Sequence, residues 1–412
     1  MSNTIVTPTV VAKEAIMQLK NSCVMGSLVY RGYESKWAKT YEGWKPGSSI
    51  TIKAPVYARV KTGATIDVVD VLEQSTTMTL EYRRHVAHRL TSEEMTYSID
   101  KFSDRIIKPA MVALADYVDS VLLGLYKGVC NQIGTPGTTP QAFLPFALAA
   151  AKMDDHAVPR DSRNLVIDPT CQAYMSDHFK GLFSQGKVDK AIEQAKIGNL
   201  AGFNLFVSQN VQNHTCGTSA GLTTNLVDGT VAENAVAINI DQNGSITTTV
   251  TQGDIFTCAG TYAVNPIAGK KLGYLRQFVV EAAGTGDGTD LLVSCTPGVA
   301  PWNIRSESAT ETYLPYQTVS GIPTDNKVVS IAGSASLVHP VNLAFHKNAF
   351  ALAMVPLEMP PSVSWKAQMS EDGYSVRVIR DFDVINDFEY IRFDVLFGVK
   401  VLNPFMACRV AG

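Results

Sequence analysis

The sequence lacks any long apolar run, and this bounds where the protein can work. The longest strongly apolar stretch, at 143–151, is far shorter than the ~20 residues that a membrane-spanning helix needs. The first ten residues, MSNTIVTPTV, lack the basic start and apolar centre of a secretory signal. We therefore expect a soluble chain that is made in the cytoplasm and has no membrane partner.

An excess of one charge is also absent. The 412 residues include 35 Lys and Arg against 38 Asp and Glu, a formal net charge of −3. A protein whose main task is tight duplex binding carries a clear basic excess, so that class is excluded. The 46% hydrophobic and 18% charged content is that of a packed protein, and the length allows two or three domains.

Cysteine is sparse and scattered. The chain has seven, and the two closest in sequence, Cys258 and Cys295, are 37 positions apart. We find no CxxC motif and predict no Cys/His cluster, so we expect no structural zinc site. An odd, dispersed set of this kind is typical of buried free thiols in a reducing compartment.

Near the N-terminus, Val11, Ala15 and Leu19 have helical spacing, and an irregular stretch with Trp37 and Trp44 follows. We expect these tryptophans to be exposed on a terminal arm. Exposed aromatic side chains need a partner surface, so we predict that they contact another part of the fold or another subunit.

Residues 50–60 alternate strictly between apolar and polar side chains, which predicts a strand with one apolar face. Pro55 favours an edge strand. Pairing is expected to resume at 66–72 and at 76–90. A long ribbon with one apolar face is marginal alone, and a neighbouring subunit is the natural surface to cover it.

Residues 98–129 have helical periodicity, with Pro109 predicting a kink or a fresh start. The next region mixes expected helices and strands and indicates an α+β unit. These elements are helices at 143–153, 170–179 and 187–197, and strands at 165–167 and 205–207.

The composition changes at 223–338, which holds five basic and ten acidic residues. Short runs rich in Thr, Val and Ser alternate with Gly-rich turns, which predicts an inserted β-barrel or sandwich. Two long strands are expected at 374–385 and 389–402, joined near 386–387.

Two segments imitate catalytic motifs without their context. The segment 217–221 fits G-x-S-x-G around Ser219, but a polar loop replaces the strand that should precede the serine. The segment 181–187 fits a phosphate-binding loop up to its lysine, but Val188 stands where a magnesium-binding Ser or Thr is needed. Hydrolysis of activated esters that disappears in Ser219→Ala would support the alternative of a serine hydrolase.

The sequence also gives little support for a metal site. His85 and His88 fall on opposite faces of an expected strand, and the 284–290 segment is a single copy of a repeat that must stack to bind calcium. The acidic residues Asp381, Asp383, Asp387 and Glu389 are better explained by a solvated strand edge and turn. We therefore predict no catalytic, cofactor-binding or metal site.

Several segments together resemble the major capsid (coat) proteins of short-tailed bacteriophages. The resemblance covers most of 1–222 and 339–412, while 223–338 matches mainly by position and composition. The family's usual Thr-Arg before PLEMP is Met354-Val355 here, so we do not expect the contact that this Arg makes in the family. The segments are NTIVTPTVVAKEAIMQLK, SIDKFSDRIIKPAMVALA, GTPGTTP, LAFHKNAFALAMVPLEMP and RFDVLFGVKVLNPFMACRV.

This resemblance implies the Hong Kong-type capsid fold, of α+β class, shared by tailed phages and herpesviruses. An all-β insertion domain occurs in the family at the position of 223–338. The implied parts are an N-terminal arm at 1–45, an extended loop at 46–75, a peripheral domain at 76–135 with a spine helix at 98–129, an axial domain at 136–222, the insertion at 223–338, and a return through both domains at 339–412.

The resemblance also implies the function: a non-enzymatic, cofactor-free shell protein that self-assembles as hexamers and pentamers around a tailed phage's double-stranded DNA. Implied partners are a scaffolding protein, a portal protein and weakly bound DNA, with decoration proteins as further candidates; the implied location is the virion capsid. A bacterial nanocompartment shell of the same fold is the alternative. We predict subunit contacts through Lys53, Arg59 and Lys61 of the loop and Trp37 and Trp44 of the arm.

Overall fold

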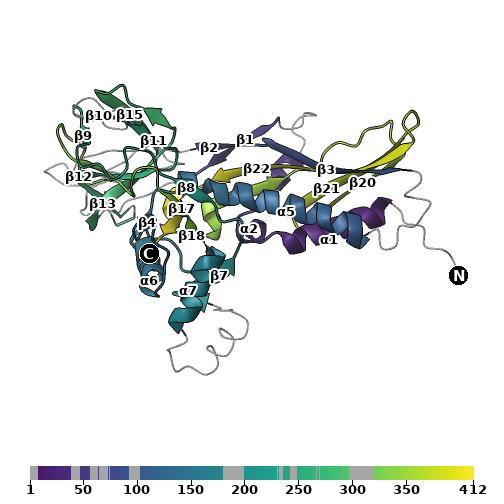
Figure 1. Cartoon of the computed structure of the whole chain (residues 1–412), viewed down its shortest axis with the longest axis horizontal. Coiled ribbons are helices and arrows are strands. Elements are labelled where there is room, and N and C mark those ends of the chain that lie inside the picture. The colour runs from purple at the N-terminus through teal and green to yellow at the C-terminus, as the bar shows by residue number, and fades with distance from the viewer. Residues whose placement is uncertain are drawn as a thin grey trace. The chain divides into compact units, whose positions relative to one another are not determined.

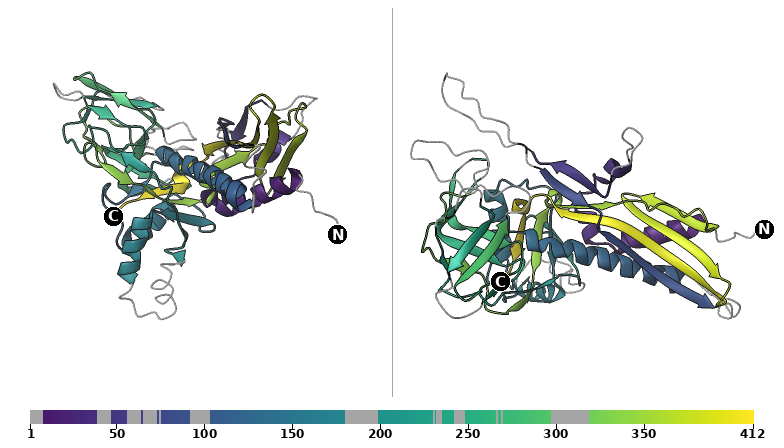
Figure 2. Two further views of the ribbon diagram at one scale, coloured as in Figure 1. Left: turned by 45° about the vertical axis from the view of Figure 1, so that its right-hand side comes forward. Right: turned by 90° about the horizontal axis from the view of Figure 1, so that it is seen from above.

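The structure is a computed structural model that describes residues 8–38, 47–55, 64, 73, 75–91, 103–179, 199–229, 231, 235–241, 248–265, 267–268, 270–296 and 319–412. The chain divides into two compact units (Figures 1 and 2), which are treated separately below. The first comprises Met1–Ile52, Thr77–Leu122 and Phe350–Lys400, and the second Lys53–Thr76, Leu123–Ala349 and Val401–Gly412.

A five-stranded sheet forms the centre of the first unit. Its longest strand, β22, pairs antiparallel with β21 on one side and with β3 on the other. The strands β21 and β22 confirm the two long strands expected near the C-terminus. The members are β19 (Phe350–Met354), β22 (Phe388–Val401), β21 (Tyr374–Asp383), β20 (Trp365–Glu371) and β3 (Tyr82–Thr91).

Helices pack against this sheet. The helix α1 (Pro8–Ser22) contacts β20 and β21 through a buried stripe that includes Val11, Ala15 and Leu19, as their spacing predicted. On α5 (Lys108–Leu123), the ring of Tyr117 meets that of Phe397 on β22. Two short helices, α2 (Met25–Leu28) and α3 (Glu34–Ala38), follow α1.

The single long helix expected at 98–129 is wrong in its extent. A π-helical turn (Ser103–Ile107) precedes α5, and a 3₁₀ turn (Gly124–Gly128) follows it. Pro109 lies in the first turn of α5, where its missing N–H leaves no bond unmade, so the fresh start predicted there is confirmed. The stretch 98–102 lies outside the described residues.

The strands β1 (Ser49–Lys53) and β2 (Ser75–Thr79) form a two-stranded sheet. The alternation predicted over 50–60 is confirmed at its start, since Ile52 is buried while Thr51 is exposed, and 56–60 lie outside the described residues. Met78 on β2 is also buried. The single apolar face expected over 76–90 is wrong, because β2 ends before Leu80 and β3 joins the larger sheet. The segment expected at 66–72 lies outside the described residues.

The body of the second unit is a six-stranded sheet with two helices, α6 (Leu144–Asp155) and α7 (Pro169–Phe179). Phe146, Met153, Cys171 and Met175 of these helices share a core with the strands, and the expected elements at 143–153, 165–167, 170–179 and 205–207 are confirmed. The helix expected at 187–197 lies outside the described residues. The strand order is β4 (Gln132–Ile133), β23 (Ala407–Val410), β18 (Asn342–His346), β5 (Arg163–Ile167), β7 (Phe203–Val207) and β6 (Asn199–Leu200).

The described part of 223–338 is all β, as expected, and its main sheet closes into a barrel. The edge strands meet through a Leu226–Val328 bridge and through backbone bonds from Val227 N to Lys327 O and from Val329 N to Asn225 O. Its order is β16 (Val329–Ile331), β12 (Ile255–Val264), β13 (Lys271–Val280), β15 (Asp290–Thr296), β10 (Ala237–Asp241) and β9 (Leu226–Val227).

Two small sheets and two 3₁₀ turns complete the second unit. The pairs are β8 (Asn213–Thr215) with β17 (Val338–Pro340) and β11 (Thr249–Val250) with β14 (Gly284–Thr285). The turns are Lys347–Ala349 and Pro404–Met406. All seven cysteines are buried and unpaired, as predicted. Among the described helices, none is long and apolar enough to cross a membrane.

Candidate functional site

The predicted contact residues divide into three outcomes. Lys53 ends β1 with an exposed side chain and forms an ion pair with Glu73 of its own chain. Arg59, Lys61 and Trp44 lie outside the described residues. Contacts of Lys53 with a neighbouring subunit stay a prediction, since exposed ion pairs of this kind contribute little energy and exchange readily.

Trp37, which we expected to be exposed, is buried. It lies on α3, is only 7% exposed, and its indole N–H donates to the carbonyl of Gly47 at 3.2 Å. The aromatic surface that seemed to need a partner is therefore covered within its own chain. Sequence spacing could not reveal this, because the irregular stretch around Trp37 has no period from which its direction follows.

The turn between β21 and β22 exposes two aliphatic side chains. Val384 is 82% exposed and Ile385 is 92% exposed, and Phe382 beside them is also exposed. Asp383 holds the turn by accepting a bond from Ile385 N at 2.9 Å. Turns normally carry polar residues, so the Val-Ile pair was a signal in the sequence that we did not use. We name residues 382–385 the hairpin tip.

A second exposed apolar surface lies on α6 of the second unit. Phe143, Leu144 and Leu148 are exposed, while Phe146 and Met153 on the other side fill the core. The helix thus has apolar residues on both faces, whereas a surface helix ordinarily has one. Exposed apolar surface of this kind marks an interaction site.

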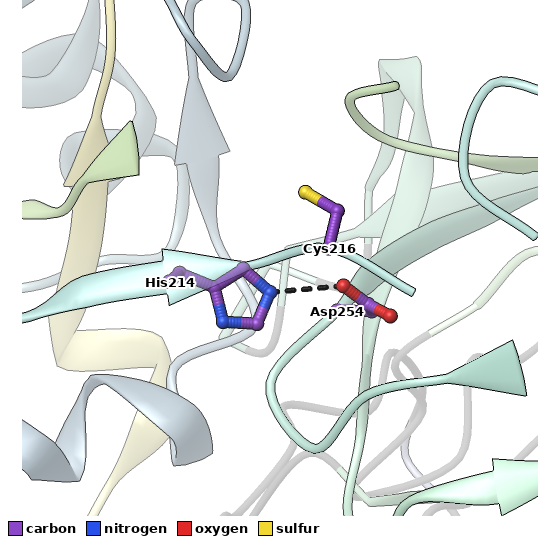
Figure 3. A group of neighbouring side chains, drawn as sticks. All are labelled: His214, Cys216 and Asp254. Carbon is purple, nitrogen blue, oxygen red and sulfur yellow. Dashed lines mark hydrogen bonds and ion pairs between the residues drawn. The ribbon is translucent and has the colours of Figure 1, made fainter. Parts of the chain in front are cut away.

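Three buried side chains of the second unit form a polar cluster (Figure 3). His214 of β8, Cys216 and Asp254 place one possible ligand atom each within 4.8 Å of one another. His214 Nε2 is 2.9 Å from Asp254 Oδ1, and its Nδ1 is 3.1 Å from the hydroxyl of Tyr126. The sequence prediction of no Cys/His cluster is wrong here: His214-x-Cys216 was the signal, and Asp254 joins it from 40 positions away.

Hydrogen bonding already satisfies this cluster. The second carboxylate oxygen of Asp254 accepts N–H bonds from Gly217 at 3.1 Å and Thr251 at 2.7 Å. Burial, with Asp254 adding to it, raises the pKa of the Cys216 thiol to about 11, which disfavours the thiolate that a metal would need. Such an arrangement is better suited to holding the segment at 214–217 against the turn at 251–254 than to binding a cation.

Gly217 is needed for this close approach. A Cβ atom there would lie 2.3 Å from the carbonyl oxygen of Thr249, nearer than any real contact. The cluster around Asp254 is also a junction between the barrel and the body of the second unit. Arg409 of β23, in the body, donates from its Nη1 to Gly253 O at 2.6 Å. Burial lowers the pKa of Arg409 to about 10.

Gln277 makes a second junction between barrel and body. Its side-chain amide accepts from Gln132 N at 2.7 Å and donates to Gln132 O at 3.0 Å, in the manner of a strand pair. The buried ammonium of Lys152 bonds to both residues. Arg276, 2% exposed, donates to the Cys130 sulfur at 3.4 Å. The two junctions, around Asp254 and Gln277, fix the barrel to the body of the second unit.

The catalytic-looking segments have ordinary structural roles where they are described. Ser219 is fully buried, and its hydroxyl donates to Asn225 Oδ1 at 3.3 Å. Asp287 in the 284–290 segment accepts bonds from the N–H groups of Thr289 and Asp290 within a turn. The segment 181–188 lies outside the described residues.

A family model described as P22 coat protein, gene protein 5, matches residues 1–412. The chain is similar to a structure from Mycobacterium phage Che8, with 13% identity, a TM-score of 0.49, and coverage of 94% of this chain and 90% of that chain. The capsid of the cyanophage P-SCSP1u has 11% identity and a TM-score of 0.44, with coverage of 89% of this chain and 84% of that chain. The capsid of Ralstonia phage GP4 has 8% identity and a TM-score of 0.45, with coverage of 94% of this chain and 88% of that chain. A search of curated proteins finds no match.

Proposed function

Because the chain belongs to the P22 coat protein family and is a structural protein of a phage capsid, we propose that it assembles as hexamers and pentamers into an icosahedral shell. The family match over residues 1–412 carries this conclusion. The fold is that of the tailed-phage capsid proteins, with an all-β insertion. The capsid of the virion is its location, and the nanocompartment alternative is not favoured.

Apolar surface that the chain leaves exposed supports assembly through many modest contacts. Burying such surface contributes roughly 25 cal/mol per Å², less the cost of ordering what binds. The hairpin tip and the exposed face of α6 are two such surfaces, one in each unit. Contacts between unlike surfaces of identical subunits close into rings. We assign these two surfaces to subunit contacts, together with the predicted residues Lys53, Arg59, Lys61 and Trp44.

We propose the domain assignment that the resemblance implied. The strand β1 falls in the extended loop at 46–75, and α6 and α7 fall in the axial domain at 136–222. The spine helix is α5, which is shorter than the expected 98–129. The remaining parts are the arm at 1–45, the rest of the peripheral domain within 76–135, the insertion at 223–338 and the return at 339–412.

We further propose a scaffolding protein and a portal protein as assembly partners, assembly in the host cytoplasm, and packaged double-stranded DNA held by weak, non-specific contacts. Decoration proteins are additional candidates. Near-neutral charge supports weak DNA contact, since a strongly basic wall would hold phosphates tightly and slow packaging.

The test is assembly of the purified chain. Sedimentation velocity and negative-stain microscopy, with and without scaffolding protein, should show closed shells of uniform size. A compact monomer that persists at high concentration with scaffolding protein present would contradict the proposal. The partners are tested separately, by whether shell yield or uniformity depends on each added protein.

A further inference from the structure

The strand β3 is the most basic exposed element among the described residues of the first unit. Its sequence, YRRHVAHRLT, holds three arginines and two histidines and no acidic residue. Arg83, Arg84 and Arg89 are all exposed. This contrasts with a chain whose overall charge is close to zero.

The topology leaves one edge of β3 open in the described part of the chain, where it pairs with β22 alone. Arg83 and Arg89 fall on the same face of the strand, opposite Leu396 and Tyr390. Six residues of antiparallel strand separate them by ~20 Å. Arg84 points to the other face, so the edge carries positive charge along its length and on both sides.

The arginines of the neighbouring strands behave differently. Arg377 and Arg392 both bond to the buried carboxylate of Asp394, and Arg380 pairs with Glu389. Those cations are therefore neutralised within the sheet. No ion pair to a described carboxylate is found for Arg83, Arg84 or Arg89.

Aromatic rings hold two of the β3 guanidinium groups in place. The Arg84 guanidinium lies 5.0 Å from the ring centre of Tyr117, and that of Arg89 lies 4.6 Å from that of Phe388. A guanidinium over a ring keeps its charge and its N–H donors, so it stays able to bind an anion. Holding it in place lowers the ordering cost of binding.

We propose that the arginine edge of β3, comprising Arg83, Arg84 and Arg89, is a weak contact site for the phosphate backbone of packaged duplex DNA. The proposal rests on the proposed function, because only a DNA-filled shell presents this partner. It adds the residues that carry the contact. Three separated charges give weak, salt-sensitive binding, which lets a genome slide during packaging.

The surface around the arginines favours DNA over an acidic protein segment. Stable protein interfaces have an apolar centre. Between Arg83 and Arg89, the same face of β3 offers His85 and Ala87, which lie opposite Asp394 and Arg392 of β22, and none of these supplies a large apolar side chain. Tyr390, 42% exposed, lies opposite Arg89 at the end of this row and not at its centre. Charged edges also prevent sheets from pairing with each other, and this is the role that the test must separate from DNA contact.

The experiment measures binding of the free full-length chain to a fluorescent DNA duplex by anisotropy, across a series of salt concentrations. Each phosphate contact contributes ~0.9 to the slope of log K against log salt, so the triple variant Arg83→Gln, Arg84→Gln, Arg89→Gln should lose about 2–3 of that slope. The matched control, Lys270→Gln, Lys327→Gln, Lys347→Gln, removes three exposed charges elsewhere and should retain the slope. The triple Arg→Lys variant should retain it as well. If the triple Gln variant does not fold, the single variant Arg83→Gln replaces it and should lose about 0.9 of the slope.

Equal losses in the Gln triple and the lysine control would overturn the proposal, because net charge alone would then explain binding. Unchanged DNA binding with blocked shell assembly would assign the edge to an acidic segment of another subunit. Unchanged binding and assembly would leave only the edge-protecting role. Failure of the wild-type chain to form shells would reject the proposed function, and it is measured separately, on unmutated protein without DNA.

Discussion

Asp119 shows how much one buried carboxylate can organise. It lies on α5 and accepts bonds from Val24 N at 2.6 Å and Gly26 N at 3.1 Å, which satisfies N–H groups at the start of the short helix α2. Burial raises its pKa to about 6, and these N–H bonds limit the rise. No sequence pattern indicates this role, since Asp119 belongs to a helix that is recognised by its apolar spacing.

The raised pKa predicts a pH dependence. Because the folded-state pKa lies above the unfolded value of 3.8, protonation of Asp119 favours folding: its contribution is fully present below about pH 4 and is lost as pH rises through about 6. Asp119→Asn removes this contribution. The unfolding free energy of the wild type minus that of the variant should be greater at pH 4 than at pH 7 by roughly 2–3 kcal/mol, because only the wild type loses this contribution as pH rises. Urea unfolding at both pH values measures it, and an unchanged difference would contradict it.

The Asp254 junction makes a second prediction at this scale. Asp254→Asn keeps the shape but gives up one carboxylate oxygen, so a buried N–H loses its acceptor. We expect a loss of about 2–4 kcal/mol in the free energy of unfolding, measured with urea. Asp228→Asn, an exposed residue of the same insertion, should cost under ~0.5 kcal/mol.

The same cluster also predicts indifference to metal. Since hydrogen bonds already satisfy His214 and Asp254, a chelator should leave the unfolding midpoint of the wild-type chain unchanged, and added Zn²⁺ should not raise it. A midpoint that falls with chelator and recovers with Zn²⁺ would identify the cluster as a metal site instead.

At the scale of elements, the hairpin tip has exposed aliphatic residues that serve assembly and not folding. The strands β21 and β22 stabilise each other through cross-strand pairs such as Arg380–Glu389, so the turn between them does not need its aliphatic residues for folding. Their exposure is therefore best explained by a surface that covers them in the shell.

This explanation predicts that Ile385→Asp blocks or strongly slows shell assembly while shifting the melting temperature of the subunit by less than ~2 °C. Light scattering and negative-stain microscopy follow assembly, and circular dichroism follows melting. Ile267→Asp is the matched control, since that isoleucine is 60% exposed on the insertion. Normal assembly of the Ile385 variant would remove the tip from the contacts.

At the scale of the whole molecule, the insertion is more than an appended domain. Deleting 223–338 would uncover Arg409 and Lys152, which now bond to Gly253 and Gln277 of the barrel. Uncompensated charges of this kind are strongly destabilising. We expect the deleted chain to aggregate or to melt well below the full chain, as measured by solubility and calorimetry. Unimpaired folding and shell assembly would contradict this and would also remove any bridging role.

The sequence by itself determined the elements whose signal is local. Alternation in 50–60 predicted the strand seen at 49–53, and helical spacing near the N-terminus and in 98–129 predicted the helices seen at 8–22 and 108–123. Such signals are local because neighbours along the chain decide which face is apolar. Family motifs spread over both ends of the chain determined the fold and the role.

Only the tertiary structure decided which distant residues meet. Asp254 joins His214, the barrel closes between 226 and 328, and Trp37 is covered. Among the described residues, the β3 arginines find no carboxylate partner, while those of β21 and β22 do. These outcomes depend on the path of the chain through space. Periodicity records the face on which a side chain lies, whereas the partner it finds there is set by segments that no local pattern encodes.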